Sequence, residues 1–300
     1  MPNRLPHPYM VLSFVALIWG ANAVAGKLAV GHISPMILTL MRWIFAVSVL
    51  APFSIAHVRR DWPLIRAHLP LLAGLGVFGF SVFNALFYLS LYYTSTLNVL
   101  IEQSAMPLFV FTLSFLLFRT RVTLFQFLGF AITAAGVAVT AAHGDLSTLL
   151  DLDLNRGDAL MLVAVVLYAS FTVALRYKPA IHWLSLIFIL SSAALVCSIP
   201  LAILEIRANA ATVPDLQGLG IALFTAIFPS IIAQSLYIRG VEMIGPNRAN
   251  IFINLTPIFG AILAILIVGE RLFAYHVVAL ALVLLGIMLA ERRIGAAAST

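Results

Sequence analysis

A carboxylate and an amide interrupt an apolar run whose sequence, LNVLIEQSAMPLFVF, covers Leu97–Phe111. These side chains are Glu102 and Gln103, and Pro107 follows them. A proline inside a helix has no N–H to donate, and it displaces the carbonyl four residues earlier, here that of Gln103. Helical spacing also places Asn98 on the same face as Glu102. A freed carbonyl, an amide and a carboxylate in one region could bind a small polar solute or a proton.

Three roles are open to Glu102. It could pair with a cation such as Arg42 or Lys27, it could bind the amine of a substrate, or it could carry a proton. The residue types are compatible with each role, so the sequence leaves all three as hypotheses.

The second half of the chain carries a similar pattern. Pro257 frees the carbonyl of Ile253, and Asn250 and Asn254 share a helical face. Neighbouring apolar runs add amides and aromatic rings at three- or four-residue steps. Polar atoms backed by aromatic rings suit a neutral, partly apolar solute, although such side chains also tie membrane helices together. We predict one substrate-binding set: Trp19, Asn22, Asn84, Tyr88, Asn98, Glu102, Gln103, Tyr168, Gln234, Tyr237, Asn250 and Asn254.

Ten apolar runs must position these residues. The 300-residue chain is 63% hydrophobic and 9% charged, whereas roughly a quarter of the residues in soluble domains are charged. The runs are continuous rather than alternating, which argues against a membrane barrel. Each run has about the 20 residues that cross a bilayer. We predict an all-α polytopic membrane protein with spans at 9–29, 33–56, 69–92, 96–118, 122–142, 157–177, 183–204, 216–238, 246–268 and 273–290.

The chain is internally duplicated. Tyr93–Thr140 aligns without a gap with Met243–Ala290, which places Pro107 on Pro257. Each half holds five runs, so the second half enters the membrane from the opposite side. Secondary transporters are built from such inverted repeats and bind substrate between them near the midplane. The predicted organisation is a first five-helix repeat at 1–142, an external linking loop at 143–156 and a second, inverted repeat at 157–300.

Two cations within the runs, Lys27 and Arg42, are expected to be structural charges. Arg42 lies about ten residues into its run, does not readily lose its proton and needs a counter-charge or carbonyl partners. Its repeat counterpart is Ser191, so the geometry that the halves share does not require a cation at this position.

Three segments resemble the drug/metabolite transporter superfamily. The first, WGANAVAGKLAVGHISPMILTLMRW, has Trp19, Gly20, Lys27, Pro35 and Arg42 in the order found there. YYTSTLNVLIEQSAMP and GPNRANIFINLTPIFGAILAILIVGERL resemble the paired motifs of the superfamily around the fourth and ninth spans. The resemblance covers essentially the whole chain. It is to the ten-span, EamA-type branch, and most of all to the bacterial aromatic amino acid exporters.

The chain departs from the family pattern at one motif. Gly269-Glu270-Arg271 in the second half faces Arg119-Thr120-Arg121 in the first. A role that requires both copies of this glutamate is therefore in doubt.

The repeat and the resemblance together imply a secondary transporter that works by alternating access. The expected activity is export of small metabolites, most of all aromatic and other neutral amino acids, across the bacterial inner membrane. A sugar-phosphate, nucleotide-sugar or drug transporter of the same fold is the alternative, and phosphorylated substrates would require several cations in the cavity. A membrane enzyme or a scaffold is a remote alternative. We expect no enzymatic activity, no cofactor and no nucleic-acid partner, and a monomer in the lipid bilayer.

Basic residues predict the orientation. They concentrate in connections on the side of the N-terminus, as at Arg59, Arg60 and Arg66, so both termini should be cytoplasmic. No metal site is expected. The calcium-like loop that begins at Asp151 has Arg156 where glycine is required, and the histidines lack ligand spacing.

Overall fold

The computed structural model describes residues 7–119, 123–145, 155–244 and 252–291. All regular secondary structure in these ranges is helical, which confirms the predicted all-α fold. Asn250, one of the predicted site residues, lies outside the described residues, as does most of the predicted linking loop.

The helices follow the predicted spans. The first half contains α1 (Pro8–Leu28), α2 (Pro35–Ala67), α3 (Leu69–Gly76), the π-helix η1 (Val77–Val82), α4 (Phe83–Ser90), α5 (Thr96–Ser104), α6 (Met106–Phe118) and α7 (Leu124–Ala141). The second contains α9 (Arg156–Ala174), η2 (Leu175–Tyr177), α10 (Trp183–Arg207), α11 (Leu216–Ile227), η3 (Phe228–Ala233), α12 (Gln234–Ile244), α14 (Thr256–Leu263), η4 (Ala264–Val268) and α15 (Ala274–Glu291). Eight helical segments of the described chain are long and apolar enough to cross a membrane, and Thr256–Val268 and Ala274–Ala290 are shorter apolar helices.

Two helices extend by six residues or more beyond their predicted ends. α2 continues to Ala67 and α12 to Ile244, whereas the apolar runs were expected to end at 56 and 238. Apolar composition marks the part of a helix that lies in hydrocarbon, and a helix can continue into the polar interface with charged side chains. The predicted spans therefore underestimate the length of these two helices.

Both predicted helix-breaking prolines lie in the first turn of a new helix. α5 ends at Ser104 and α6 begins at Met106, with Pro107 in its first turn. In the second half α14 begins at Thr256, with Pro257 in its first turn, directly after a turn. The fourth and ninth spans are therefore discontinuous at corresponding positions of the repeat.

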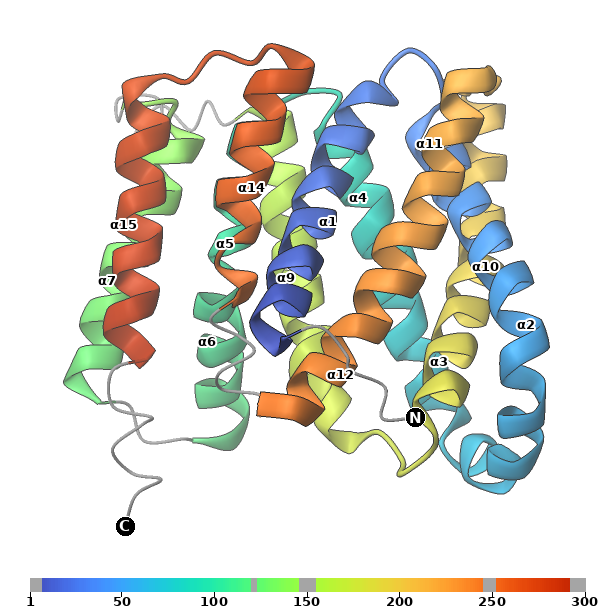
Figure 1. Ribbon diagram of the computed structural model, residues 1–300. Coiled ribbons are helices and arrows are strands. Elements are labelled where there is room, and N and C mark those ends of the chain that lie inside the picture. The colour runs from blue at the N-terminus through green and yellow to red at the C-terminus, as the bar shows by residue number, and fades with distance from the viewer. Residues whose placement is uncertain (1–6, 120–122, 146–154, 245–251, 292–300) are drawn as a thin grey trace.

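Pairs of long helices form two opposite sides of the bundle (Figure 1). α7 packs on α15 on one side of the bundle through small residues. The helices are so close that a Cβ on Gly129 would lie 2.5 Å from the carbonyl oxygen of Gly286. A Cβ on Gly136 would likewise lie 2.8 Å from the carbonyl oxygen of Ala279. Small residues allow membrane helices to approach this closely.

α2 and α10 form the pair on the opposite side of the bundle. A carboxylate joins these two helices near each end of the pair. Glu205, near the end of α10, accepts hydrogen bonds from the Ser34 hydroxyl at 2.6 Å and from two backbone N–H groups in the first turn of α2. Asp61, in α2, accepts hydrogen bonds from the His182 backbone N–H and the Ser185 hydroxyl, both at 2.8 Å. Each carboxylate satisfies donors that a helix start leaves unpaired. We call this pair the α2–α10 strut.

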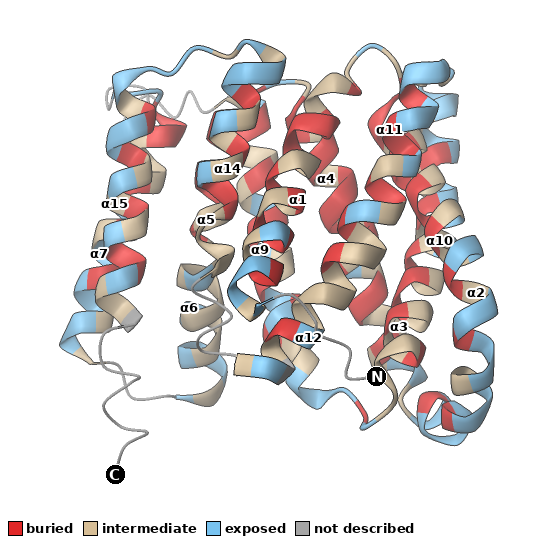
Figure 2. Cartoon of the chain, viewed as in Figure 1, coloured by how far each residue is buried: buried red, intermediate tan, exposed pale blue. Residues whose placement is uncertain are grey.

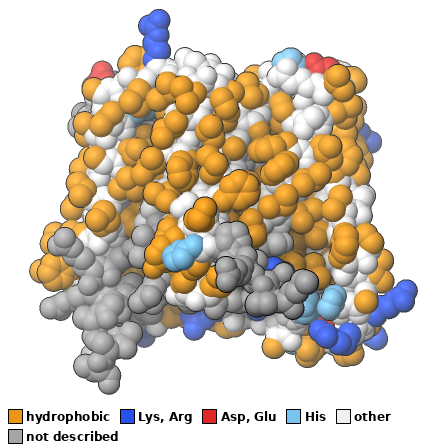
Figure 3. All heavy atoms as spheres, viewed as in Figure 1, with side chains coloured by type: hydrophobic (Ala, Val, Ile, Leu, Met, Phe, Trp, Pro, Cys, Tyr) orange, Lys and Arg blue, Asp and Glu red, His pale blue; other side chains and the backbone are white. Residues whose placement is uncertain are grey.

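The fourth span is packed more tightly where α5 begins than where α6 ends, and we call the end of the bundle at which α5 begins the closed end. All residues from Thr96 to Glu102 in α5 are buried, whereas α6 has no buried residue (Figure 2). Apolar side chains cover the flank of the molecule, and Lys and Arg side chains lie at its two margins (Figure 3). Such a belt is what a multi-pass membrane protein presents to lipid.

Candidate functional site

A buried arginine lies at the centre of a group of neutral polar side chains. Arg42 is 6% exposed. Its Nη1 donates to Asn84 Oδ1 at 2.7 Å and to the Tyr88 hydroxyl at 2.5 Å, and it lies 3.5 Å from Asn22 Oδ1. Its Nε donates to Ser230 Oγ at 2.8 Å. We call these five residues the Arg42 cluster. They come from the first, second, third and eighth spans, so the cluster joins both halves.

The Arg42 cluster contains no negative charge. Among the described residues, no carboxylate lies within ion-pair distance of Arg42, and its Nη2 donates no hydrogen bond. A buried cation with only dipolar partners is costly to maintain in a membrane. The guanidinium group therefore retains the capacity to bind an anion.

A proline explains why Ser230 faces Arg42. Pro229 lies in the π-helix η3 and displaces the carbonyl four residues earlier, that of Thr225. The Ser230 hydroxyl donates to this carbonyl oxygen at 2.9 Å, which leaves its own oxygen to accept the bond from Arg42. The third span also contains a π-helix, η1, and π-helical turns are frequent at functional sites.

Aromatic rings surround the Arg42 cluster. The Arg42 guanidinium carbon lies 5.1 Å from the ring centroid of Trp43. Tyr168 packs against Phe83, the residue before Asn84 in α4, with the ring centroids 4.7 Å apart, and the rings of Trp19 and Tyr237 lie 5.4 Å apart. Three aromatic residues predicted from the sequence, Trp19, Tyr168 and Tyr237, therefore lie near the cluster.

Three other predicted residues are not part of this group. Gln103, Gln234 and Asn254 are partly buried. None of them forms a hydrogen bond with the Arg42 cluster in the described parts of the chain. Gln103 and Asn254 instead lie at the helix breaks before Pro107 and Pro257.

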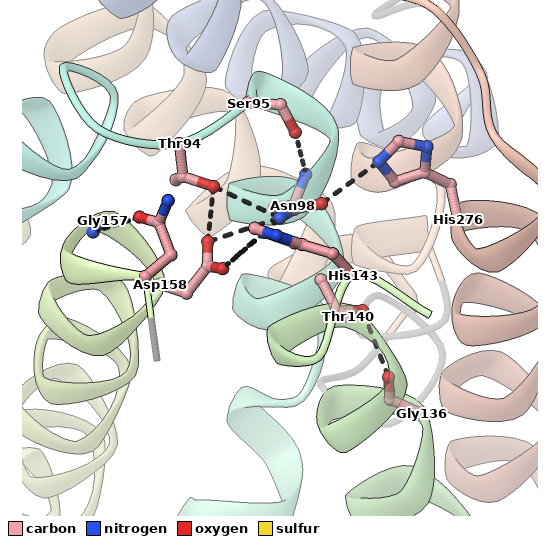
Figure 4. Close-up of polar contacts among 10 residues, drawn as sticks. Thr94, Ser95, Asn98, Gly136, Thr140, His143, Gly157, Asp158 and His276 are labelled. Atoms are coloured by element: carbon pink, nitrogen blue, oxygen red, sulfur yellow. Dashed lines mark hydrogen bonds and ion pairs between the residues drawn. The ribbon is translucent and has the colours of Figure 1, made fainter. Parts of the chain in front are cut away.

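Asn98 belongs to a second polar group at the closed end of the bundle (Figure 4). Asp158, at the start of α9, accepts a hydrogen bond from the Thr94 hydroxyl and long contacts of 3.4 and 3.5 Å from Asn98 Nδ2. His143 Nε2 lies 2.9 Å from Asp158 Oδ2, and His276 Nε2 lies 3.1 Å from Asn98 Oδ1. We call these five residues the Asp158 network. Only Asn98 was predicted from the sequence.

Glu102 has no cation partner among the described residues, so the pairing with Arg42 or Lys27, one of the three roles that the sequence left open, is not made in this conformation. Its side chain is fully buried, and neither carboxyl oxygen has a hydrogen-bond partner in the described structure. Arg42 instead donates to the neutral side chains of its cluster. Lys27 Nζ donates to the carbonyl oxygens of Leu91 and Thr94, each at 2.8 Å, and its structural role stays a prediction.

The glutamate of the second-half motif, which aligns with a threonine in the first half, caps α5. Glu270 accepts hydrogen bonds from the backbone N–H groups of Thr96 at 2.7 Å and Leu97 at 3.1 Å. Its sequence counterpart Thr120 lies outside the described residues. This carboxylate attaches the segment after the ninth span to the start of the fourth, at the closed end of the bundle.

A groove on the flank of the bundle is separate from both polar groups. Its volume is about 770 Å³, and it shares no residue with the Arg42 cluster or the Asp158 network. Its walls are mainly apolar and face the region that lipid would occupy. The groove is lined by Tyr9, Met10, Val11, Ser13, Phe14, Leu17, Leu236, Arg239, Met243 and Phe259.

No group of three or more His, Cys, Asp or Glu side chains that could hold a metal occurs in the described ranges.

A family model for the EamA-like transporter family matches the chain twice, over residues 8–142 and 155–291. The chain belongs to this family. This EamA-like protein is therefore a multi-pass membrane transporter, and no feature described above indicates catalysis.

Relatives of this EamA-like transporter occur in bacteria and archaea. YyaM of Bacillus subtilis, named an uncharacterized transporter, is 25% identical over 296 residues, which cover 94% of this chain and 93% of the relative. An uncharacterized transporter of Archaeoglobus fulgidus is 27% identical over 290 residues, which cover 95% and 99%. These names indicate transport without naming a substrate.

A solved structure has the same fold as this EamA-like transporter. It matches with a TM-score of 0.62 at 17% sequence identity and covers 94% of this chain and 96% of that chain. The likeness concerns the fold alone.

Proposed function

We propose that this EamA-like transporter exports small carboxylate-bearing metabolites, most of all aromatic and other neutral amino acids, across the bacterial inner membrane by alternating access. The observation that carries the proposal is the buried guanidinium group of Arg42, which has four neutral hydrogen-bond partners and no described carboxylate partner. Arginine presents a planar set of donors that matches a carboxylate.

Arg42 then has a second role beyond the structural one expected from the sequence. Its bonds to Asn84, Tyr88 and Ser230 hold the guanidinium in place, and Nη2 is left to bind the substrate carboxylate. A pre-positioned donor loses less conformational freedom on binding. The aromatic residues Trp19, Tyr168 and Tyr237 supply surface for an apolar side chain.

The number of available cations supports a carboxylate over a phosphorylated substrate. Lys27 is occupied by two backbone carbonyls, which leaves Arg42 as the available cation among the predicted site residues. One guanidinium balances one carboxylate. A sugar phosphate or nucleotide sugar carries more negative charge than this cluster can neutralise.

Alternating access is supported by the unequal packing of the two ends. α5 is buried and α6 is not, and the break between them lies at the same level of the repeat as the break before α14. Under the predicted orientation, with both termini cytoplasmic, the closed end is external and the open end is cytoplasmic. An exporter that waits for its substrate is expected to have this form.

The test is counterflow in liposomes that contain the purified protein and unlabelled tryptophan, with labelled tryptophan outside. Tryptamine, which is tryptophan without the carboxylate, and indole propionate, which lacks the amine, serve as competitors. We expect indole propionate to compete and tryptamine to compete poorly. Arg42→Gln should weaken tryptophan binding roughly 30-fold or more, because truncating one member of a buried charge pair costs about 2–5 kcal/mol.

Arg42→Lys is the matched variant, because it keeps the charge and loses the planar fork. We expect partial retention of transport. Equal competition by tryptamine and indole propionate would contradict carboxylate binding at Arg42. Absence of counterflow with tryptophan and a panel of amino acids, from folded protein, would overturn the proposed substrate class.

A further inference from the structure

The groove on the flank of the bundle, which we call the flank groove, lies along the first and eighth spans. Its lining comes from the first half of α1, from α12 and from Phe259 of α14. α1 and α12 pack against each other in this region (Figure 1). Because the lining shares no residue with the Arg42 cluster, the flank groove is separate from the substrate site proposed above.

A close contact between α1 and α12 separates the flank groove from the interior of the bundle. Gly240 is buried, and a Cβ there would overlap the side chain of Leu12. Leu12 is itself 1% exposed. Its neighbours Val11 and Ser13 line the groove, as does Arg239 beside Gly240. An occupant of the groove therefore lies against the outer side of the two helices.

The chemistry of the lining calls for an occupant with a long apolar part and an anionic group. The groove has a volume of about 770 Å³, within the range of roughly 300–1,000 Å³ that ligand sites occupy. Arg239 is the one charged side chain among the described lining residues, and the others are almost all apolar. Arg239 is exposed, and no described carboxylate lies within ion-pair distance of it.

Arg239 lies at the depth where lipid headgroups are expected. The contact of Gly240 with Leu12 places it about one helical turn, or 5.4 Å, from the start of α1. Tyr9 lies at that start, and its ring stacks on Phe252 at 5.2 Å. Tyrosine is enriched where a membrane meets water, and a long arginine side chain reaches that level from within the apolar layer.

We propose that the flank groove binds an anionic phospholipid, with its phosphate on Arg239 and one acyl chain along α1 and α12. The lipid comes from the leaflet on the side of the N-terminus, which is the cytoplasmic leaflet in the predicted orientation. Basic pockets between membrane helices bind anionic headgroups on that side. An anionic lipid is favoured over a zwitterionic one, because no acid in the described lining is available to pair with an ammonium group.

The test is native mass spectrometry of the protein in detergent, titrated with dioleoyl phosphatidylglycerol or dioleoyl phosphatidylethanolamine. We expect the parent to bind one phosphatidylglycerol more tightly than further copies, and more tightly than phosphatidylethanolamine. Arg239→Gln should bind phosphatidylglycerol roughly fivefold more weakly, the usual contribution of one basic residue near a membrane surface. Arg239→Lys keeps the charge and should bind as the parent.

Arg66→Gln is the matched control. Arg66 is also exposed, lies in the last turn of α2 and is not part of the groove, so its removal should leave phosphatidylglycerol binding unchanged. Ser13→Phe tests the apolar part, because the larger side chain fills the groove and leaves Arg239 in place. We expect weaker binding of phosphatidylglycerol by this variant.

Thermal unfolding in detergent shows whether each variant is folded and whether the lipid stabilises it. Phosphatidylglycerol should stabilise the parent and Arg66→Gln more than Arg239→Gln, because a ligand stabilises the state that binds it. Glycerophosphoglycerol, the same headgroup without acyl chains, should not displace the bound lipid. Equal binding by Arg239→Gln and Arg66→Gln, equal binding of the two lipids by the parent, or displacement by glycerophosphoglycerol overturns the proposal.

Discussion

At the residue scale, the important polar contacts join side chains that are far apart in the sequence. The prolines, and the polar residues on helical faces, predicted part of the lining around Arg42. Asp158 and His276 were missed, because their partners are brought together only by the packing of α5, α9 and α15. One signal for this network was available in the sequence: Asp158 is an acid at the second position of the apolar run that begins at residue 157.

The role proposed here for Arg42 goes beyond the structural role that the sequence argument predicted. Its repeat counterpart Ser191 suggested a structural role, and that inference treats the halves as equivalent. Substrate binding does not require equivalence, because a bound solute is itself asymmetric. A lone cation in one half can bind a carboxylate for which the other half needs no counterpart.

His182, at the start of α10, gives a pH prediction. Desolvation lowers the pKa of His182, and the nearby His57 and Arg60 lower it further. The His182 Nδ1 atom accepts the backbone N–H of Leu184 at 3.3 Å, a bond that protonation removes. Because the folded-state pKa is below the unfolded one, this contribution is present above the ordinary value of about 6.5 and is lost as the pH falls through the lowered value.

The measurement is thermal unfolding of the purified protein on either side of that pH. Acidification should cost about 1 kcal/mol at this helix start, the usual effect of losing an N-cap. His182→Asn keeps a capping oxygen that does not titrate, so its stability should depend less on pH. An equal pH dependence in the variant would assign the effect to other groups.

At the element scale, proline positions predicted the two helix breaks, whereas the π-helices η1 and η3 were not predicted. A proline removes a specific hydrogen bond, so its effect can be located from the sequence. A π-helical turn depends on which backbone carbonyl accepts a hydrogen bond from another donor in place of its usual helical N–H partner. In η3 that donor is the Ser230 hydroxyl, and Pro229 was the available signal.

The contact between α7 and α15 gives a prediction at this scale. A Cβ on Gly129 would lie 2.5 Å from the Gly286 carbonyl oxygen and 2.8 Å from the Ala290 backbone nitrogen. Because backbone atoms cannot rotate away, Gly129→Ala should force the helices apart and cost about 1–3 kcal/mol, as overpacking does. The measurement is thermal unfolding in detergent.

Gly220→Ala is the matched control. Gly220 is also in a helix, and a Cβ there would meet nothing within 4 Å. It should be neutral or stabilise by up to about 1 kcal/mol, because alanine is the better helix former. Similar losses in the two variants would contradict the close helix approach.

At the scale of the whole molecule, the strut and the closed end should move differently. Spin labels at Phe53 and Val196, exposed on α2 and α10, should keep one distance with and without tryptophan. Labels at Leu272 and Val213, which are exposed beside α15 and α11, should show a changed or broadened distribution. Cys197 must first be replaced, because it is the one native cysteine. Unchanged distances in both pairs would contradict alternating access at this end.

The two carboxylates of the strut cross between the halves of the chain. Glu205 belongs to the second half and completes the start of α2, while Asp61 belongs to the first and completes the start of α10. A substitution of either carboxylate in one half should therefore disturb a helix start in the other half. Glu205→Gln would loosen the half that does not carry it, and Asp61→Asn would do the same in return. Each half therefore supplies the carboxylate that completes the start of a helix in the other half.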